Sequence, residues 1–183
     1  ESIDEHWAST TGNFDGCENL KEVTFGEGIT QICNSLFSYC GGLEEINIPS
    51  SVRIIAGDAF KGCSSLTKVT IPDNVTEIGS AAFESCTALR SFSLGSGITE
   101  LHDRTFFGCT SLESAVLPEG ITRIGVANFA ECTALRSIYI PASLESIDEH
   151  WASTMGNFDG CKNLKEVTFG EGITQICGSL FSY

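Results

Sequence analysis

The side chains with the greatest capacity for chemistry in this chain are nine cysteines and three histidines. Thiols can bind metals, form disulfides or act as nucleophiles when a base lies within hydrogen-bond reach. Seven cysteines recur in five steps of 23 residues and one of 29: Cys17, Cys40, Cys63, Cys86, Cys109, Cys132 and Cys161. Zinc-binding cysteines come in closely spaced pairs, so this wide, regular interval indicates a structural repeat instead.

We expect the seven cysteines to form a ladder of buried, reduced thiols that pack as small apolar groups. Neighbouring repeats could bring two thiols within disulfide reach, but seven in one column cannot all pair. Cys33 and Cys177 lie outside the column, at equivalent positions of two copies of the sequence, and we expect them to fill buried space. The cysteines alone therefore do not indicate an oxidising compartment.

The histidines provide little support for catalysis. His6 and His150 are copies of one position, which leaves His102 as the only other kind. The run Asp148-Glu149-His150 could suggest a metal site, but three adjacent polar residues in a loop are usually solvated. The sequence has no GxSxG, HExxH or phosphate-loop pattern. We therefore expect no enzymatic activity, no metal and no cofactor.

Other residue types keep the register of the cysteines. A Phe lies three residues before each cysteine of the column and a Leu three residues after it. All four prolines share one further column: Pro49, Pro72, Pro118 and Pro141. The sequence also repeats with a second, longer period than the 23-residue repeat, because residues 1–39 and 145–183 are identical at 36 of 39 positions. We expect residues 1–183 to form a single solenoid, as a window of a longer array with a 144-residue unit.

One repeat, the coil of residues 63–85, predicts the fold. Val69 and Ile71 alternate with polar residues as in a strand, and Pro72 ends that strand because it has no amide proton. Val75 and Ile78 give a second apolar step. Stacked coils would bury these columns together, with a parallel sheet on one side and irregular or short helical turns behind it.

The coils at 40–62 and 63–85 resemble the leucine-rich repeats of the BspA-like, treponemal-type family of bacterial surface antigens, with the pattern C-x-x-L-x-x-[VI]-x-[IL]-P-x-x-[VI]-x-x-I-G-x-x-A-F-x-x. The resemblance implies a leucine-rich-repeat horseshoe with a concave sheet, a cell-surface or secreted location, and binding or adhesion. The usual asparagine ladder is absent, since only Asn74 retains Asn in that column. We expect its amide to turn inward, although Asn74-Val75-Thr76 is also a glycosylation sequon.

The charge of the chain is unevenly placed. The net charge is −14, which argues against nucleic acid as a partner, and no apolar run is long enough for membrane insertion. Residues four, five and seven positions after each cysteine should face outward from the sheet, and they carry equal numbers of acidic and basic residues. Our candidate binding residues on this concave face are Lys68, Arg90, Glu113, Val116, Arg136 and Tyr139. An ordinary solvated sheet is the alternative.

A six-residue insertion before Cys161 is the most distinctive departure from the repeat, and its copy precedes Cys17. Trp151, its copy Trp7, and Met155 form a possible assembly contact on the convex side. Packing of Trp151 on its own coil is the alternative.

The sequence favours a non-enzymatic, extracellular or cell-surface module that binds a protein or glycan on another cell through the concave face. The alternative is a structural segment of a repetitive filament or surface coat, which self-associates through coil ends or the convex insertion. Near-identical 144-residue copies favour the filament, and variation between the coils of one copy favours recognition.

Overall fold

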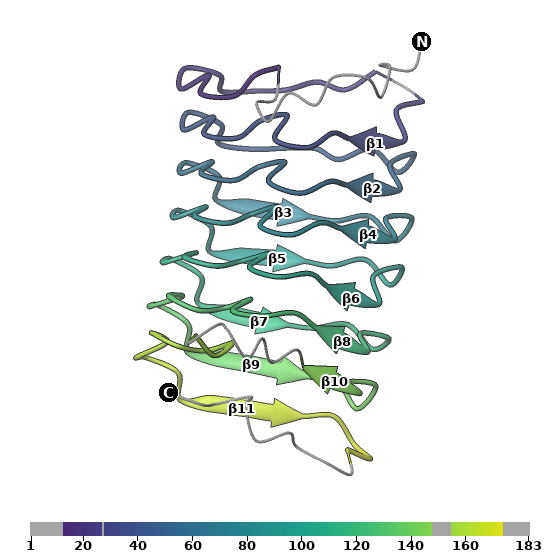
Figure 1. Cartoon of the computed structure of the whole chain (residues 1–183), viewed down its shortest axis with the longest axis vertical. Helices are drawn as coiled ribbons and strands as arrows, with labels where there is room; N and C mark the ends of the chain where they lie inside the picture. Colours follow the sequence, from purple (N-terminus) through teal and green to yellow (C-terminus); the bar gives the residue numbers. More distant parts are fainter. Residues whose placement is uncertain (1–12, 27, 148–154, 174–183) are drawn as a thin grey trace.

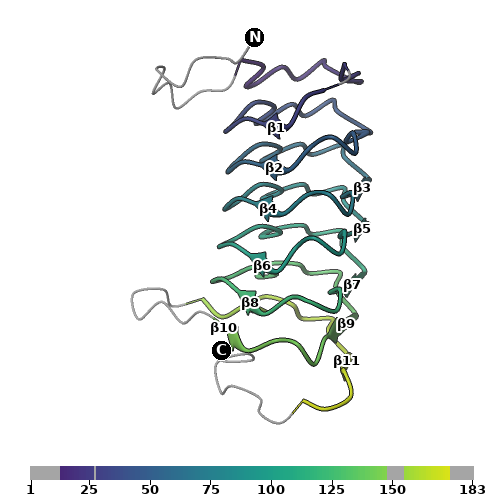
Figure 2. The ribbon, with the colours of Figure 1, turned by 90° about the vertical axis from the view of Figure 1, so that its right-hand side faces the viewer.

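The structure is a computed structural model that describes residues 13–26, 28–147 and 155–173. The chain winds into coils stacked along one axis, as Figure 1 shows, each running from one cysteine of the column to the next. The coils that begin at Cys63, Cys86, Cys109 and Cys132 each contribute a first strand and, after a turn, a shorter second strand, whereas the coils that begin at Cys17 and Cys40 contribute a second strand only. Figure 2 shows the first and second strands as two columns on different sides of the stack.

The first strands form parallel sheets in the order β3-β5 and β11-β9-β7. Each begins about five residues after its cysteine, where polar and apolar residues alternate. Their bounds are β3 (Lys68–Thr70), β5 (Ser91–Ser93), β7 (Ser114–Val116), β9 (Ser137–Ile140) and β11 (Glu166–Phe169).

The second strands form parallel sheets in the orders β1-β2-β4 and β10-β8-β6. The predicted leucine-rich-repeat solenoid with a parallel sheet is confirmed. Of the two alternatives for the side behind the first sheet, the described residues show irregular turns, together with these short strands, and not short helices. Among the described residues there is no helix of any kind, and so none long and apolar enough to span a membrane. The bounds are β1 (Gln31–Ile32), β2 (Ile54–Ile55), β4 (Glu77–Ile78), β6 (Glu100–Leu101), β8 (Arg123–Ile124) and β10 (Ser146–Ile147).

The strand register confirms the repeat and places the insertion. Ser114 pairs with Ser137, 23 residues later, whereas Ser137 pairs with Glu166, 29 residues later. The amide of Phe129 donates to the carbonyl of Asn157 at 3.0 Å, so the register is restored by residue 157. The six extra residues therefore lie in the sequence between β10 and Asn157, and the stacking of coils continues after Asn157.

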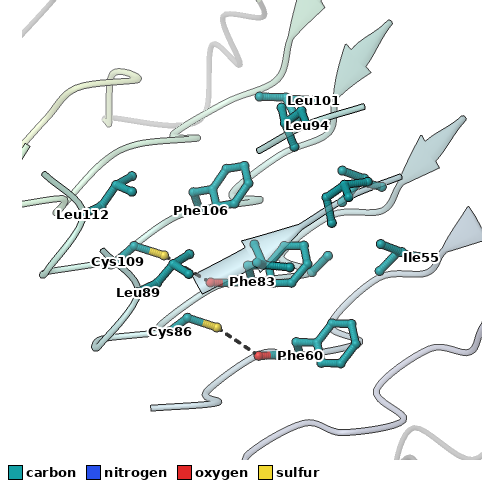
Figure 3. Close-up of a cluster of buried hydrophobic side chains, with 14 of the residues drawn as sticks. Ile55, Phe60, Phe83, Cys86, Leu89, Leu94, Leu101, Phe106, Cys109 and Leu112 are labelled. Atoms are coloured by element: carbon teal, nitrogen blue, oxygen red, sulfur yellow. Dashed lines mark hydrogen bonds between the residues drawn. The ribbon is translucent and has the colours of Figure 1, made fainter. Parts of the chain in front are cut away.

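The core lies between the two strand columns and consists of the repeated apolar residues. The phenylalanines stack face to face from coil to coil, with ring centroids 5.4 to 5.9 Å apart along the column Phe14, Phe37, Phe60, Phe83, Phe106, Phe129 and Phe158. This spacing slightly exceeds the separation of neighbouring strands, which is about 4.8 Å. Figure 3 shows Phe60, Phe83 and Phe106 in one buried cluster with Leu89, Leu94, Leu101 and Leu112.

Residues with positive φ occur at two positions of the return turns, and the residues at each position form a column along the stack. The second column immediately precedes the cysteines and alternates glycine with other residues: Gly16, Tyr39, Gly62, Ser85, Gly108, Glu131 and Gly160. Glycine adopts this left-handed backbone without the steric cost that a side chain incurs.

Candidate functional site

The six candidate binding residues lie on one outer surface of the stack. We define the first-strand face as the outward residues of β3, β5, β7, β9 and β11 together with the residue before each strand. The structure places Lys68 in β3, Val116 in β7 and Tyr139 in β9, and Arg90, Glu113 and Arg136 at the starts of β5, β7 and β9. All are exposed except Tyr139, which is half-buried.

Alternation along the strands sets this orientation. Val69, Ala115 and Ile138 point into the core and are almost completely buried. Their neighbours in each strand therefore point outward, because successive side chains lie on opposite faces of a sheet. The structure thus brings Arg90, Glu113, Val116, Arg136 and Tyr139 together on three consecutive coils, while Lys68 lies one coil before them.

A row of charges runs along the beginning of the strands. The amide of Glu113 donates to the carbonyl of Arg90 at 3.3 Å, the amide of Arg136 to that of Glu113 at 2.9 Å, and the amide of Lys165 to that of Arg136 at 2.8 Å. These bonds fix the four residues as direct neighbours. Within the described part of the chain, none of their side chains forms an ion pair. Their charges are therefore available to a ligand.

An apolar and aromatic row lies beside the charges. Val116 pairs with Tyr139, and Tyr139 with Thr168. The Val116 side chain is 63% exposed, more than that of any other large hydrophobic residue described. Exposed serines lie on the same face at positions 91 and 93 of β5 and at position 114 of β7. The surface can therefore make apolar contacts and hydrogen bonds side by side.

Two residues that sequence reasoning missed hold Tyr139 in place. The Tyr139 hydroxyl donates a hydrogen bond to the carboxylate of Glu119, and this bond, with the nearby negative charge, raises the pKa of Tyr139. A Cβ on Gly170 would lie 2.9 Å from the Tyr139 hydroxyl oxygen, so Gly170 leaves the space that this side chain uses. Gly170 stands at the position where four other coils have proline. This replacement was the only sign in the sequence that the position contributes to the site.

The cysteine column forms a ladder of thiols along the return side of the coils. Thiols of the column donate to the carbonyl of the phenylalanine that lies three residues before the preceding cysteine: Cys86 bonds Phe60 at 3.2 Å and Cys109 bonds Phe83 at 3.3 Å (Figure 3). The same bond recurs at Cys40, Cys63, Cys132 and Cys161. The eight cysteines that the structure describes all carry free thiols.

Burial differs along the ladder. Cys40, Cys63, Cys86, Cys109 and Cys132 are buried, Cys161 is half-buried and Cys17 is exposed. Burial raises the pKa of the Cys63 thiol to about 12 and that of Cys161 to about 11. Such thiols remain protonated and unreactive at neutral pH.

Cys33, expected to be buried, is half-exposed. It directly follows the inward residue Ile32 of β1 and therefore faces out of the core. Cys177 lies outside the described residues.

The assembly residues are only partly within the described chain. Trp7, Trp151 and the run Asp148-Glu149-His150 lie outside it. Met155 is half-buried and packs with Phe107 against Val126, Ala127 and Ala130, a small apolar cluster separate from the main core.

His102 lies 3.5 Å from a Glu100 carboxylate oxygen that also pairs with Arg123. No three metal-binding side chains gather anywhere in residues 13–26, 28–147 or 155–173.

Asn74 does not turn inward, so this expectation was wrong. Its side chain is exposed, and its amide group donates to the carbonyl of Ser50 in the preceding coil at 2.9 Å. Asn74 follows Pro72 and Asp73 in the turn between β3 and β4, which passes along the surface. It therefore links adjacent coils from outside the core.

The repeat now found in three dimensions also matches a known family. The family described as "BspA type Leucine rich repeat region" matches in six copies, over residues 10–69, 30–154 and 153–183. No curated protein matches the chain in sequence.

Solved bacterial structures share the fold. A leucine-rich repeat protein of T. pallidum is 29% identical, with a TM-score of 0.69 over 78% of this chain and 67% of that one. A leucine-rich cell surface protein of Faecalibacterium prausnitzii is 26% identical, with a TM-score of 0.53 over 85% of this chain and 61% of its own. A Bacteroides ovatus leucine-rich repeat protein is 26% identical, with a TM-score of 0.57 over 86% of this chain and 51% of its own.

The chain thus spans less than two thirds of the Faecalibacterium and Bacteroides proteins. The matched repeats, the 23-residue register and the parallel coils agree with one another. This chain belongs to the family of BspA-type leucine-rich repeat proteins.

Proposed function

We propose that this chain is part of a cell-surface protein that binds a protein or glycan partner through its first-strand face, without enzymatic activity. One observation carries the proposal: the exposed Val116 lies beside a fixed Tyr139, next to Arg90 and Arg136 that have no ion-pair partner among the described residues. Aromatic residues and arginines dominate the binding energy of protein interfaces.

The distribution of charge supports recognition at this face. The net charge of −14 is carried mainly by other surfaces, so anionic molecules are repelled elsewhere. The serines around Val116 are small and can hydrogen-bond without blocking a partner. A surface location is supported by the family and by the Faecalibacterium neighbour, which is described as a cell surface protein.

The test is binding of the whole chain to an array of purified extracellular-matrix proteins and mucin glycans. A variant with Arg136→Ala and Tyr139→Ala should lose at least ~10-fold in affinity for whichever molecule the wild type binds, since interface anchors contribute about 2 kcal/mol or more each. The control carries Arg53→Ala and Thr99→Ala in the second-strand column and should bind like the wild type. Equal binding by the Arg136/Tyr139 variant would contradict the proposal.

A structural filament is the second candidate, and the near-identity of residues 1–39 and 145–183 favours it. A polymer benefits from identical units, whereas a recognition surface benefits from different ones. Negative-stain microscopy with light scattering separates the two functions. Discrete particles of one chain support the binding module, and ordered filaments support the structural role.

A further inference from the structure

Three rows of outward side chains run along the first-strand face, parallel to the axis of the solenoid. Figure 2 shows the strands that carry them, β3, β5, β7, β9 and β11, on one side of the stack. The first row is charged and lies just before the strands: Arg90, Glu113, Arg136 and Lys165. The second row is small and polar: Ser91, Ser114 and Ser137. The third row is mainly apolar or aromatic: Val116, Tyr139 and Thr168.

The serine row ends at a charge of opposite sign on each side. Lys68 pairs with Ser91 across β3 and β5, and Glu166 pairs with Ser137 across β11 and β9. Lys68 and Glu166 are both exposed, and neither forms an ion pair within the described part of the chain. The row from Lys68 to Glu166 covers four steps between coils, or about 19 Å at the usual spacing of strands.

The charged row is also available to a partner. At the same position of two earlier coils, Lys21 and Glu44 form an ion pair at 4.0 Å. Arg90 and Glu113 are neighbours of the same kind, and so are Glu113 and Arg136, but neither pair forms an ion pair among the described residues. These side chains therefore do not neutralise one another at short range.

The spacing along the rows matches an α-helix better than an extended chain. Neighbouring coils are joined by backbone hydrogen bonds along the charged row, so its residues recur about every 4.8 Å. One turn of an α-helix rises about 5.4 Å, whereas side chains on one side of a strand recur about every 6.6 Å. A helix laid along the axis therefore presents about one turn to each coil, and an extended peptide falls out of step about three times faster.

The distance across the rows also matches a helix. Each serine follows its charged residue by one position and precedes the third row by two, so about 10 Å of strand separates the outer rows. An α-helix with its side chains is about 10 to 12 Å wide. Because serine is small, a helix can lie on the serine row with one flank against the charges and the other against Val116 and Tyr139.

The charges determine which helix fits and in which direction it runs. The positive N-terminal end of a helix dipole is favoured near Glu166, and the negative C-terminal end is favoured near Lys68. Read from that N-terminus, the charged row is basic, basic, acidic and basic. The complementary helix is acidic, acidic, basic and acidic at positions i, i+4, i+7 and i+11, which share one side of a helix.

We propose that the partner of the first-strand face is an α-helical protein segment of about 13 residues, the number that spans the serine row at 1.5 Å each. The helix lies along the solenoid axis with its N-terminus at Glu166 and its C-terminus at Lys68. Its charged stripe faces the charged row, and its apolar stripe packs on Val116 and Tyr139. This inference rests on the proposed function of the face and specifies the class of partner.

A designed, fluorescently labelled peptide tests the helix. It carries Glu, Glu, Lys and Glu at i, i+4, i+7 and i+11, leucines on the stripe that faces Val116 and Tyr139 in this orientation, and alanine elsewhere. Fluorescence anisotropy with the whole chain should show saturable binding. The peptide with the reverse sequence has the same composition and should bind at least ~10-fold more weakly, because its dipole and its apolar stripe then face the wrong way.

A charge reversal links this binding to one position. Glu113→Arg should weaken binding of the designed peptide at least ~10-fold, and replacing the single Lys of the peptide by Glu should restore binding to that variant. The control is Glu77→Arg on the exposed side of β4, which changes the net charge equally and should bind like the wild type.

The proposal is overturned if the designed peptide does not bind up to millimolar concentration, or if its reverse binds equally well. Binding that Glu113→Arg leaves unchanged would overturn it too. A glycan that binds the array-tested chain through Arg136 and Tyr139 would support the proposed function and contradict the helical partner, so the two proposals can fail separately.

Discussion

The ring of Tyr39 lies directly over the α-carbon of Gly62 in the next coil: a Cβ on Gly62 would be 2.5 Å from Cδ1 of Tyr39. The same relation recurs two coils later, where a Cβ on Gly108 would lie 3.4 Å from the Ser85 hydroxyl oxygen. It recurs again at Gly160, where a Cβ would lie 2.7 Å from the Glu131 carboxyl carbon. In the column that immediately precedes the cysteines, the side chains of Tyr39, Ser85 and Glu131 therefore each lie over a glycine in the next coil.

Gly62→Ala should destabilise the protein by about 2 to 4 kcal/mol, because it places a side chain at φ +70° and against the Tyr39 ring. Gly16→Ala is the matched control. Gly16 has φ +71°, and no atom lies within 4 Å of the place that a Cβ would take there, so its substitution incurs the backbone cost alone, about 1 kcal/mol. Urea unfolding of both variants measures the difference, and equal losses would show that the Tyr39 contact contributes nothing.

Ser85→Gly should stabilise the protein by about 1 kcal/mol, since Ser85 has φ +59° and glycine adopts that backbone more easily. Ser91→Gly, in the extended strand β5, should instead destabilise by about 0.5 to 1 kcal/mol. The two midpoints of thermal unfolding should therefore move in opposite directions. A lower midpoint for Ser85→Gly would contradict the strain argument.

Glu84 should make stability sensitive to acid. Its side chain is only 10% exposed and accepts two hydrogen bonds from Arg104, at 2.9 and 3.1 Å, with Lys61 3.5 Å away. Burial opposes the charge of Glu84, but Arg104 and Lys61 outweigh it and lower the pKa. A lowered pKa in the folded state means that this stability is complete at neutral pH and is lost as the pH falls below about 4.

Glu84→Gln should therefore cost about 1 to 2 kcal/mol at pH 7 and much less at pH 3, measured by urea unfolding at both values. Glu77→Gln, at an exposed position of β4, serves as the control and should change stability little at either pH. A loss at Glu84 that is equally large at pH 3 would indicate packing instead of charge.

Thiol reactivity should follow the burial of the ladder. Iodoacetamide at pH 8 should modify Cys17 and Cys33 in the native protein within minutes, because both are accessible. Cys63, whose pKa is raised to about 12, and the fully buried Cys86 should react only as the protein unfolds. Peptide mass spectrometry identifies the sites, and a sample in denaturant shows that every thiol can react. Rapid labelling of Cys86 in the native protein would contradict the prediction that the buried thiols are inaccessible in the folded state.

The sequence predicted those features of the fold that depend on a repeated side-chain type. Phe83, Cys86 and Leu89 recur in register, and identical residues stack when like coils stack. The alternation of Val69 and Ile71 likewise predicted which residues of β3 face outward. The first-strand face could therefore be assembled residue by residue before the structure was known.

The second strands could not be foreseen, because a two-residue strand such as β4 is too short to show alternation. The bond between Tyr139 and Glu119 was missed for a different reason. The two residues lie 20 positions apart and belong to neighbouring coils, so only the stacking geometry brings them together. Asn74 was misplaced because a ladder asparagine was expected inside a curved turn, whereas this turn runs along the surface.

The alternation of glycine and side chain before the cysteines also limits how this gene can change length. Its period is two coils, or 46 residues, and six coils bring it back in phase, so that Gly16 and Gly160 occupy equivalent positions. Recombination that removed residues 40–62 alone would set Tyr39 against Ser85, with no glycine between them. We therefore expect natural variants of this array to gain and lose coils in even numbers.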